Sequence, residues 1–212
     1  MSLETERRLM VERQLRGRGI RDERVLAAMG ALPREKFVPE NARPYAYRDE
    51  PLPIGSGQTI SQPYMTALMA QSLELAGSET VLEVGGGCGY HAAVLAALAA
   101  RVVTIERVPE LAAMARRNLA DLANVLVVEA DGSLGFAELA PFDAITVAAA
   151  SADIPPALIE QLKDSGRLVI PVGSSVEQEL RVVRKEGGAL RWQVAAQCRF
   201  VPLIESPESK RD

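Results

Sequence analysis

Histidine and cysteine are scarce in this sequence, and each shortage excludes a class of site. The 212 residues include one histidine, His91, and two cysteines, Cys88 and Cys198. A histidine-based metal site cannot be built from one histidine, and a Ser-His-Asp triad would have to use His91. The two cysteines give neither a disulfide framework nor a zinc pattern. We therefore expect no metal site, and the cytoplasm is the expected compartment.

Long apolar runs and blocks of one charge are also absent. No apolar run approaches the roughly 18 residues needed to cross a bilayer. The first 16 residues are charged throughout, without the apolar core of a signal peptide. The net charge is −4, with no basic block, so we expect neither a membrane nor nucleic acid as a partner. The length fits one domain, residues 1–212, and a monomer is the default expectation.

The most informative stretch is residues 80–91, with the sequence TVLEVGGGCGYH. It predicts a β-strand, a glycine turn and an alanine-rich helix that runs to about residue 100. Glycines at positions 85, 87 and 89 allow positive φ and let a ligand approach the backbone. The N-terminus of the following helix favours an anionic group. Together these features predict a nucleotide-type pocket, although the glycines alone also fit a tight strand-to-helix turn.

The spacing around this turn favours one kind of nucleotide. A dinucleotide fingerprint would need glycine at Tyr90, and no lysine follows the glycines as a phosphate-binding loop requires. Glu83 lies in the strand before the turn, and the next predicted strand, 102–105, ends on Glu106. That is the distance at which an acidic side chain reaches ribose hydroxyls. A ribose-bearing ligand without a pyrophosphate fits best, and S-adenosylmethionine is the common one; a nicotinamide-dependent oxidoreductase is a distant alternative.

Strands and helices alternate along the rest of the chain, which predicts a parallel sheet covered on both faces. Strands are predicted at 80–84, 102–105, 125–128, 142–147 and 166–171, and helices at 3–16, 22–30, 65–73, 92–100, 109–122 and 155–162. Later runs at 178–184 and 192–201 flank a Gly187-Gly188 turn and predict an antiparallel hairpin. The predicted fold is α/β, doubly wound and Rossmann-like, with an N-terminal helical segment and a C-terminal hairpin. We expect residues 1–78 to form the helices and a covering loop, 79–175 the cofactor-binding core, and 176–212 the hairpin and tail.

The positions of other residues in the predicted fold indicate further candidates for the site. Ligands of such a fold bind beyond the carboxyl ends of the strands. There, Asp131 can accept a hydrogen bond from an adenine amino group, although it equally fits a turn before Gly132. The glycine- and proline-rich stretch 45–57 predicts an irregular functional loop. Next along the chain, Thr59 or Ser61 is predicted from spacing alone to be the N-cap of a helix.

At this point the sequence resembles a known family over residues 14–204. The family is that of the protein-L-isoaspartate (D-aspartate) O-methyltransferases. The glycine motif alone indicates only a class I S-adenosylmethionine-dependent methyltransferase, whereas the segment Gln58-Thr59-Ile60-Ser61 is far more specific, because other methyltransferases lack it. Further matching segments include Arg18-Gly19-Ile20, Phe37-Val38-Pro39, Pro51-Leu52-Pro53-Ile54-Gly55, Val81-Leu82-Glu83-Val84-Gly85, Asp131-Gly132, Gly166-Arg167-Leu168, Pro171-Val172-Gly173 and Phe200-Val201-Pro202-Leu203.

The resemblance implies methyl transfer from S-adenosylmethionine to the α-carboxylate of L-isoaspartyl residues in damaged proteins and peptides. The resulting ester closes to a succinimide, whose hydrolysis returns some normal aspartate. Ser61 would be the catalytic residue, at the acceptor carboxylate. Cofactor binding is implied for Gln58, Thr59, Ile60, Glu83, Gly85, Gly87, Gly89, Glu106, Asp131 and Gly132. The peptide groove would be lined by Pro53, Ile54, Ser61, Val201, Pro202 and Leu203. A carboxylate nucleophile is already ionised at neutral pH and needs no general base.

The chain departs from the family pattern at four positions. Relatives usually have threonine or serine at Gly86, serine at Cys88, often glutamine at His91, and glycine at Ala130. Flexibility at Gly86 predicts weaker cofactor binding. Cys88, near a helix N-terminus, could have a lowered pKa, although replacement of one small residue by another is the reading we favour. His91 is expected in the first helical turn near the pocket rim.

Two alternatives to repair remain open. A relative could methylate a normal aspartate in a dedicated peptide, installing succinimide or isoaspartate there. A protein of this fold could also bind S-adenosylmethionine without turnover.

Overall fold

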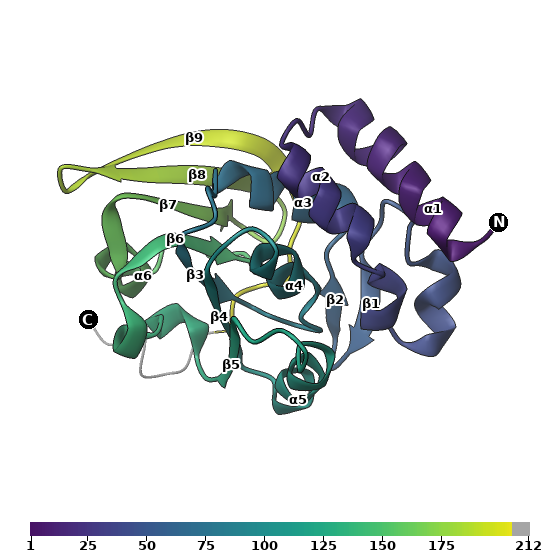
Figure 1. Cartoon of the computed structure of the whole chain (residues 1–212). Helices are drawn as coiled ribbons and strands as arrows, with labels where there is room; N and C mark the ends of the chain where they lie inside the picture. The colour runs from purple at the N-terminus through teal and green to yellow at the C-terminus, as the bar shows by residue number, and fades with distance from the viewer. Residues whose placement is uncertain (205–212) are drawn as a thin grey trace.

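The computed structural model describes residues 1–204, and a seven-stranded sheet forms its centre (Figure 1). The strands of this sheet are β3 (Thr80–Val84), β4 (Arg101–Glu106), β5 (Val125–Glu129), β6 (Phe142–Val147), β7 (Leu162–Gly173), β8 (Gln178–Glu186) and β9 (Ala189–Cys198). Their order is β5-β4-β3-β6-β7-β8-β9. Strands β3 to β7 pair in parallel, and β8 and β9 add to β7 in antiparallel fashion. The predicted doubly wound sheet and C-terminal hairpin are confirmed.

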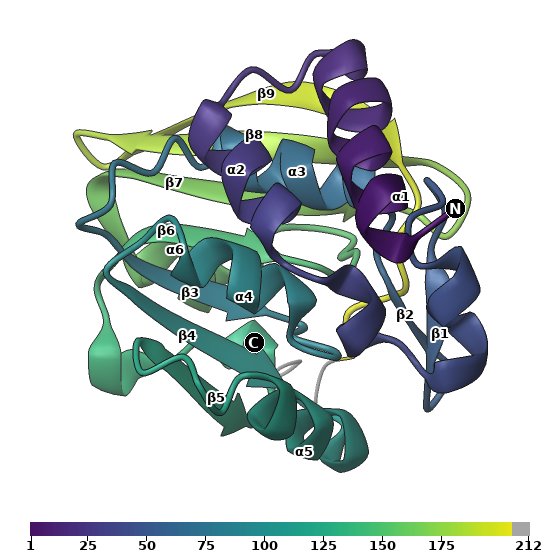
Figure 2. The same cartoon turned by 45° about the vertical axis from the view of Figure 1, so that its right-hand side comes forward.

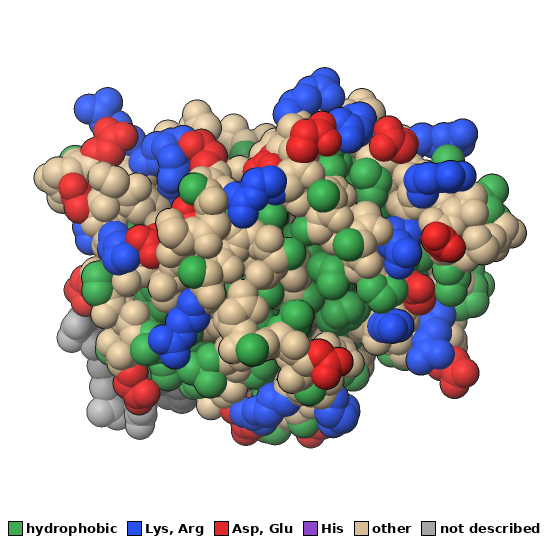
Figure 3. Space-filling model, in the orientation of Figure 1, with side chains coloured by type: hydrophobic (Ala, Val, Ile, Leu, Met, Phe, Trp, Pro, Cys, Tyr) green, Lys and Arg blue, Asp and Glu red, His purple; other side chains and the backbone are tan. Residues whose placement is uncertain are grey.

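Helices cover both faces of the sheet, as the apolar strands require. The helices are α1 (Leu3–Leu9), α2 (Glu23–Ala31), α3 (Pro63–Ser72), α4 (Tyr90–Ala96), α5 (Pro109–Asn118) and α6 (Pro156–Glu160). Val81 and Val102 belong to a hydrophobic cluster with α2 to α5, whereas their neighbours Leu82 and Val103 join Leu158 of α6 in a second cluster. Figure 2 shows α2, α3 and α4 over one face. Charged side chains of both signs are interspersed over the surface seen in Figure 3.

The N-terminal quarter differs from the sequence predictions. The helix predicted at 3–16 is α-helical only to Leu9 and continues as a π-helix (Met10–Leu15) and a 3₁₀ turn (Arg16–Arg18). Two 3₁₀ helices follow α2, at Arg34–Phe37 and Glu40–Tyr45. The stretch 45–57, predicted to be an irregular loop, contains the first strand and the turn of a two-stranded hairpin.

That hairpin pairs β1 (Leu52–Gly55) with β2 (Gln58–Ile60). The pattern was misleading because Pro53 is typical of loops, yet proline is also tolerated in an edge strand of this kind.

Boundaries also shift in the C-terminal half. Strand β7 begins at Leu162, four residues before the predicted start at 166, because Leu162 already pairs with Phe142 before an irregularity in the ladder. The sequence pattern does not indicate this early start, because residues 163–165 are polar and interrupt the apolar run. Strand β9 ends at Cys198 and not at 201. Short 3₁₀ helices at Gly132–Leu134 and Ala137–Leu139 complete the fold.

The strand order places a crevice at the middle of the sheet. From β3 the chain moves outward through β4 and β5, then returns to the other side of β3 with β6 and β7. Ligands bind beyond the carboxyl ends of the strands at such a reversal. The glycine turn is tied to this edge, since the N–H groups of Gly85 and Gly86 donate to the Ile105 carbonyl at 2.8 and 3.0 Å. Within residues 1–204 no helix combines the length and apolarity needed to cross a membrane.

Candidate active site

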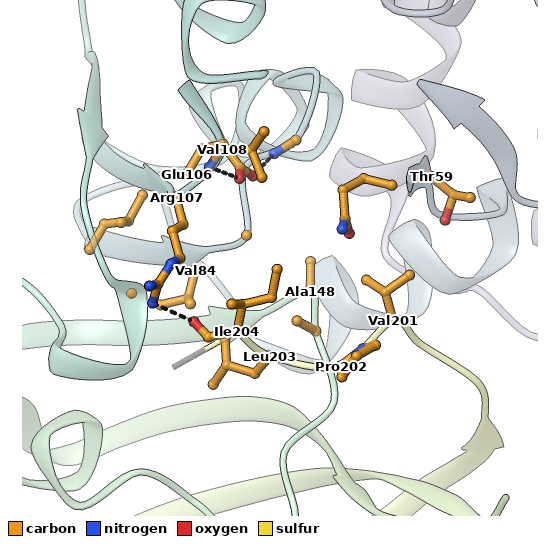
Figure 4. A pocket seen from close by; sticks show the side chains of 16 residues that line it. Thr59, Val84, Glu106, Arg107, Val108, Ala148, Val201, Pro202, Leu203 and Ile204 are labelled. Carbon is orange, nitrogen blue, oxygen red and sulfur yellow. Dashed lines mark hydrogen bonds between the residues drawn. The ribbon is translucent and has the colours of Figure 1, made fainter. Parts of the chain in front are cut away.

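A pocket lies beyond the carboxyl ends of β3, β4 and β6 (Figure 4), and we call it the cofactor pocket. It contains about 560 Å³ of empty space, counting the part open to solvent. It is lined by Gln58, Thr59, Val84, Gly85, Gly87, Ile105, Glu106, Arg107, Val108, Gly132, Ala148, Ala149, Val201, Pro202, Leu203 and Ile204. Figure 4 shows Glu106 and Thr59 on opposite sides, with Ala148 between them.

Glu106 presents a fixed carboxylate in this pocket. Its Oε2 accepts a hydrogen bond from the Gly87 N–H and its Oε1 from the Val108 N–H, both at 2.8 Å. The residue is only 7% exposed. A carboxylate held by two backbone donors at the tip of β4 is suited to accept hydrogen bonds from a pair of ribose hydroxyls.

Asp131 lies beside the pocket and not in its lining. Its Oδ1 accepts hydrogen bonds from Ser133, through the N–H at 3.0 Å and Oγ at 2.7 Å, and its Oδ2 accepts from Arg107 Nη1 at 3.1 Å. Arg107 and Gly132 line the pocket at this point. The role of Asp131 toward an adenine group stays a prediction.

The three predicted glycines divide into two roles. Gly85 and Gly87, with φ of 85° and 55°, line the cofactor pocket. A Cβ on Gly87 would lie 3.2 Å from Ile54 Cδ1, so the turn and the β1–β2 hairpin approach closely here. A Cβ on Gly89 would lie 2.8 Å from Leu119 Cδ1. Gly89, which is not a lining residue, therefore makes room for the residue that follows α5.

An inner cavity continues from the cofactor pocket past the glycine turn. The two hollows share Thr59, Gly85, Gly87 and Ala148. The other lining residues of the inner cavity are Ile54, Ile60, Ser61, Thr66, Met69, Glu83, Gly86, Cys88, Tyr90 and His91. At its base Glu83 is fully buried, and its Oε2 accepts a hydrogen bond from Thr104 Oγ1 at 2.5 Å. His91 lies in the first turn of α4, as expected, but its side chain is only 10% exposed and lines the inner cavity and not the pocket rim. Its Nδ1 lies 3.1 Å from Glu83 Oε1.

A third hollow, the acceptor groove, opens toward solvent next to Ser61. It is lined by Pro51, Thr59, Ser61, Gln62, Met65, Ala148, Gln197, Cys198, Arg199, Phe200 and Val201. Thr59 and Ala148 line all three hollows, and Ser61 lines both the inner cavity and the groove. The three spaces therefore meet at the 59–61 segment.

The residues predicted to line the peptide groove are only partly together. Ser61 and Val201 line the groove, whereas Pro202 and Leu203 line the cofactor pocket and Ile54 lines the inner cavity. Pro53 is exposed and lies outside the three linings.

Residues 200–204 cross the mouth of the site, and we call this segment the strap. Phe200 N–H donates to Gln178 Oε1 at 2.7 Å, and Gln178 Nε2 donates to the Phe200 carbonyl at 3.3 Å. Leu203 N–H donates to the Ala150 carbonyl at 2.7 Å. At the far end, Arg107 Nη1 donates to the Ile204 carbonyl at 3.1 Å. The strap is thus fixed to the end of β6 and to β8.

The prediction that Thr59 or Ser61 caps a helix is wrong. Helix α3 begins at Pro63, and its N-cap, Gln62, makes no side-chain capping hydrogen bond. Asp49 Oδ1 instead accepts a hydrogen bond from the Tyr64 N–H at 3.0 Å. Because Asp49 supplies the capping oxygen from the preceding loop, Ser61 remains beside the site.

The suggestion of a lowered thiol pKa at Cys88 is also wrong. Cys88 is 2% exposed, and burial raises the pKa of its thiol to about 11. Desolvation of the thiolate outweighs the hydrogen bond from the Tyr90 backbone, which lowers the pKa. Cys88 is therefore a buried structural thiol.

Two site residues escaped the sequence analysis. Arg107 lines the cofactor pocket, and Thr104 holds Glu83. The signal for Thr104 was a polar residue inside an otherwise apolar strand, in direct register with Glu83 of β3. Among residues 1–204 there is no cluster of three or more His, Cys, Asp or Glu residues that could hold a metal ion.

Comparison with known proteins places this arrangement in a family. The family model for protein-L-isoaspartate(D-aspartate) O-methyltransferase matches residues 5–208. The chain belongs to that family. A protein-L-isoaspartate O-methyltransferase of Koribacter versatilis is 57% identical over 201 residues, which cover 94% of this chain and 90% of that relative.

Solved structures of the protein-L-isoaspartate O-methyltransferase family have the same fold. One superposes with a TM-score of 0.84 at 30% identity, covering 92% of this chain and 65% of that one. Another, a putative member from Plasmodium falciparum in complex with S-adenosyl-L-homocysteine, gives a TM-score of 0.83 at 26% identity, covering 94% of this chain and 99% of that one.

Proposed function

We propose that this chain transfers the methyl group of S-adenosylmethionine to the α-carboxylate of L-isoaspartyl residues in damaged proteins and peptides. The observation that carries the proposal is the meeting of the cofactor pocket, the inner cavity and the acceptor groove at Thr59 and Ser61. A donor bound on one side and an acceptor on the other would meet at this segment, which the sequence resemblance singled out.

The residues of the site fit the cofactor. Glu106 would hold the ribose, and Gly132 and Arg107 would border the adenine end of the cofactor pocket. Gly85 and Gly87 leave a passage where side chains would obstruct the way to the inner cavity. Glu83 Oε1 lies 3.1 Å from His91 Nδ1, with no other polar partner within residues 1–204, and this buried carboxylate suits a positively charged group. When bound, S-adenosylmethionine supplies a methyl group on a sulfonium cation.

The acceptor chemistry needs little from the protein beyond positioning. The α-carboxylate is ionised at neutral pH, so its oxygen can bond to the methyl carbon while the carbon–sulfur bond breaks, leaving S-adenosylhomocysteine. The Ser61 hydroxyl would donate a hydrogen bond that orients this carboxylate without removing a proton. The 58–61 segment and the strap would exclude water and hold the reactants in line.

The direct test is methyl transfer from labelled S-adenosylmethionine to two peptides that differ only in L-isoaspartate or L-aspartate. We expect base-labile labelling of the isoaspartyl peptide alone. Labelling of the aspartyl peptide would instead indicate a peptide-specific aspartyl methyltransferase. Cofactor binding without labelling of either peptide would indicate a binding module and contradict the proposal.

Ser61→Ala tests the proposed role of the serine in the same assay. Loss of one oriented hydrogen bond to a charged group predicts a roughly 10- to 100-fold fall in kcat/KM. Cofactor affinity, measured by calorimetry, should be preserved. Ser56→Ala provides a matched control, since Ser56 lies in the exposed turn between β1 and β2 and should leave methyl transfer unchanged.

The division of the chain into a covering part (1–78), a core (79–175) and a hairpin with tail (176–212) also stays a proposal. A monomeric state and a cytoplasmic location are likewise proposals. The two free cysteines support the cytoplasmic location.

A further inference from the structure

The acceptor groove is lined by one charged side chain, that of Arg199. Its other lining residues are neutral, and no acidic residue among residues 1–204 belongs to the lining. Arg199 is exposed, and within the same residues its side chain makes no hydrogen bond and no ion pair. A guanidinium stays charged at every physiological pH and presents five N–H donors in a planar fork. An unpaired cation therefore borders the groove in which the acceptor peptide would lie.

Arg199 also lines a fourth hollow, which lies next to the acceptor groove and which we call the serine hollow. The two spaces share Arg199 and Phe200, and they contain about 1160 and 1020 Å³ of empty space, counting the parts open to solvent. Ser151, Ser174 and Ser175 line the serine hollow, where Arg199 is again the one charged lining residue from the described part of the chain. Hydroxyl and guanidinium donors together suit an anionic group.

The backbone on either side of Arg199 is fixed. Cys198 is the register partner of Gln178 at the end of β9. Phe200 makes two hydrogen bonds with the Gln178 side chain, at 2.7 and 3.3 Å, and Gln178 is buried. Because these anchors come directly before and after Arg199, the residue is held at the junction of the groove and the serine hollow.

The charges around the groove leave Arg199 without a counter-ion. The loop that leads into the groove carries Asp49 and Glu50, but Asp49 pairs with Arg18, and Glu50 pairs with Arg48 at 3.8 Å. The whole chain has a net charge of −4, so its long-range field favours basic peptides. A preference for acidic peptides would therefore have to come from Arg199 itself.

These observations point to a charge preference in the acceptor. Ser61, the proposed partner of the isoaspartyl carboxylate, lines the same groove as Arg199, so peptide residues that flank the isoaspartate would pass the guanidinium. We propose that Arg199 makes this chain selective for isoaspartyl sites flanked by an aspartate or glutamate side chain, whose carboxylate it binds at the junction of the groove and the serine hollow. The inference rests on the proposed function, since it concerns the same acceptor. Arg199 is a specificity residue and takes no part in the methyl transfer itself.

A set of isoaspartyl peptides tests the proposal on the full chain. The peptides share one sequence and carry glutamate, glutamine or lysine at a single position, placed on the N-terminal side of the isoaspartate in one series and on the C-terminal side in the other. In one series kcat/KM should be roughly three- to fivefold higher for the glutamate than for the glutamine peptide, as for an ion pair open to solvent. The difference should lie in KM, because the flanking carboxylate does not react. Sodium chloride at about 0.5 M should reduce it.

Variants assign the preference to one side chain. In Arg199→Gln the glutamate-to-glutamine ratio of kcat/KM should fall to one or below, and in Arg199→Glu the lysine peptide should become the preferred substrate. Arg191→Gln is the matched control, because Arg191 is a β9 residue that is 80% exposed and lines neither hollow. It removes the same charge and should keep the ratio of the unmodified protein. Damage to the fold would lower kcat/KM for all peptides alike and leave the ratio unchanged.

Two outcomes would overturn the proposal. A glutamate-to-glutamine ratio of one in both series with the unmodified protein would show that the groove does not read flanking charge. A ratio that persists in Arg199→Gln would assign the preference to another residue. If no isoaspartyl peptide were methylated, the proposed function would fall together with the inference, whereas methylation that is indifferent to flanking charge would overturn the inference alone.

Discussion

At the scale of single residues, Gly86 shows how a departure from the family pattern acquires a physical reason. Its φ is not positive, so conformational freedom does not explain the glycine. Lack of space explains the glycine, because a Cβ would lie 2.3 Å from Thr104 Oγ1. The sequence suggested a cost in flexibility at Gly86, whereas the structure shows a packing contact between the glycine turn and Thr104 of β4.

Gly86→Ala should therefore destabilise the protein by about 1–3 kcal/mol through overpacking. Thr104→Ala removes the contacting hydroxyl, so Gly86→Ala should be much less destabilising in a protein that carries both changes. The double variant should therefore be more stable than the sum of the single effects predicts. Urea unfolding of the four proteins measures this coupling. Strictly additive free energies would contradict the proposed contact.

Glu106 permits a second prediction at the same scale. Glu106→Gln replaces one of two acceptor oxygens by an NH₂ group that faces a backbone N–H of Gly87 or Val108. Since a hydrogen bond to a charged group contributes about 1.5–3 kcal/mol, we expect cofactor affinity to fall roughly tenfold or more, as measured by calorimetry.

Glu129→Gln is the matched control for Glu106→Gln. Glu129 is the register partner of Glu106 at the end of the neighbouring strand, but its side chain is 42% exposed and pairs with Arg116 on the surface. Its replacement should leave affinity unchanged. Equal cofactor affinities in the two variants would show that Glu106 does not bind the ribose.

At the scale of elements, prediction succeeded where one physical factor decides the structure. A short and mostly apolar run predicts a strand of a parallel sheet, and β3 to β6 were found within a residue or two. It failed where a partner is distant in sequence. Asp49 caps α3 from the preceding loop, Leu162 joins β7 by pairing with Phe142, and Cys88 is desolvated by elements that no local pattern reveals.

The same distinction between local pattern and distant partner applies to the residues of the site. Glu83, Gly85, Gly87 and Glu106 lie at the tips of strands, and their position could be predicted. Ser61 was identified only through the resemblance, because its spacing fits a helix cap equally well. The involvement of Arg107 and Gln178 depends on where the strap crosses, which the sequence does not encode locally.

The strap makes an element-level prediction possible. Gln178 is 5% exposed and makes two hydrogen bonds to Phe200. Gln178→Ala should loosen the strap and raise both the KM for an isoaspartyl peptide and the dissociation constant of the cofactor, by roughly fivefold or more at about 1 kcal/mol per hydrogen bond. The control is Gln193→Ala on the exposed strand β9, which should change neither constant. Altered unfolding with unaltered binding would assign Gln178 a purely structural role.

At the scale of the whole molecule, the site depends on a core that encloses unusual titratable groups. The N-terminal helices and α3 pack against α4 and bury Cys88 and Tyr90 beside the glycine turn. Burial raises the pKa of the Cys88 thiol to about 11 and that of the Tyr90 hydroxyl to about 12. In the unfolded chain these groups ionise near their ordinary values of 9.0 and 10.0.

Stability should therefore fall at alkaline pH. Below pH 9 both states carry these protons and the full stability is present; between pH 9 and about 12 the unfolded chain binds fewer protons, so the free energy of unfolding decreases as pH rises. Each group contributes at most about 1.4 kcal/mol per pH unit. Urea unfolding at pH 8, 9.5 and 10.5 measures the slope, and Cys88→Ser, which replaces the titrating thiol by a hydroxyl, should make it shallower. A flat profile over this range would mean that the α3–α4 interface opens to water in the native state.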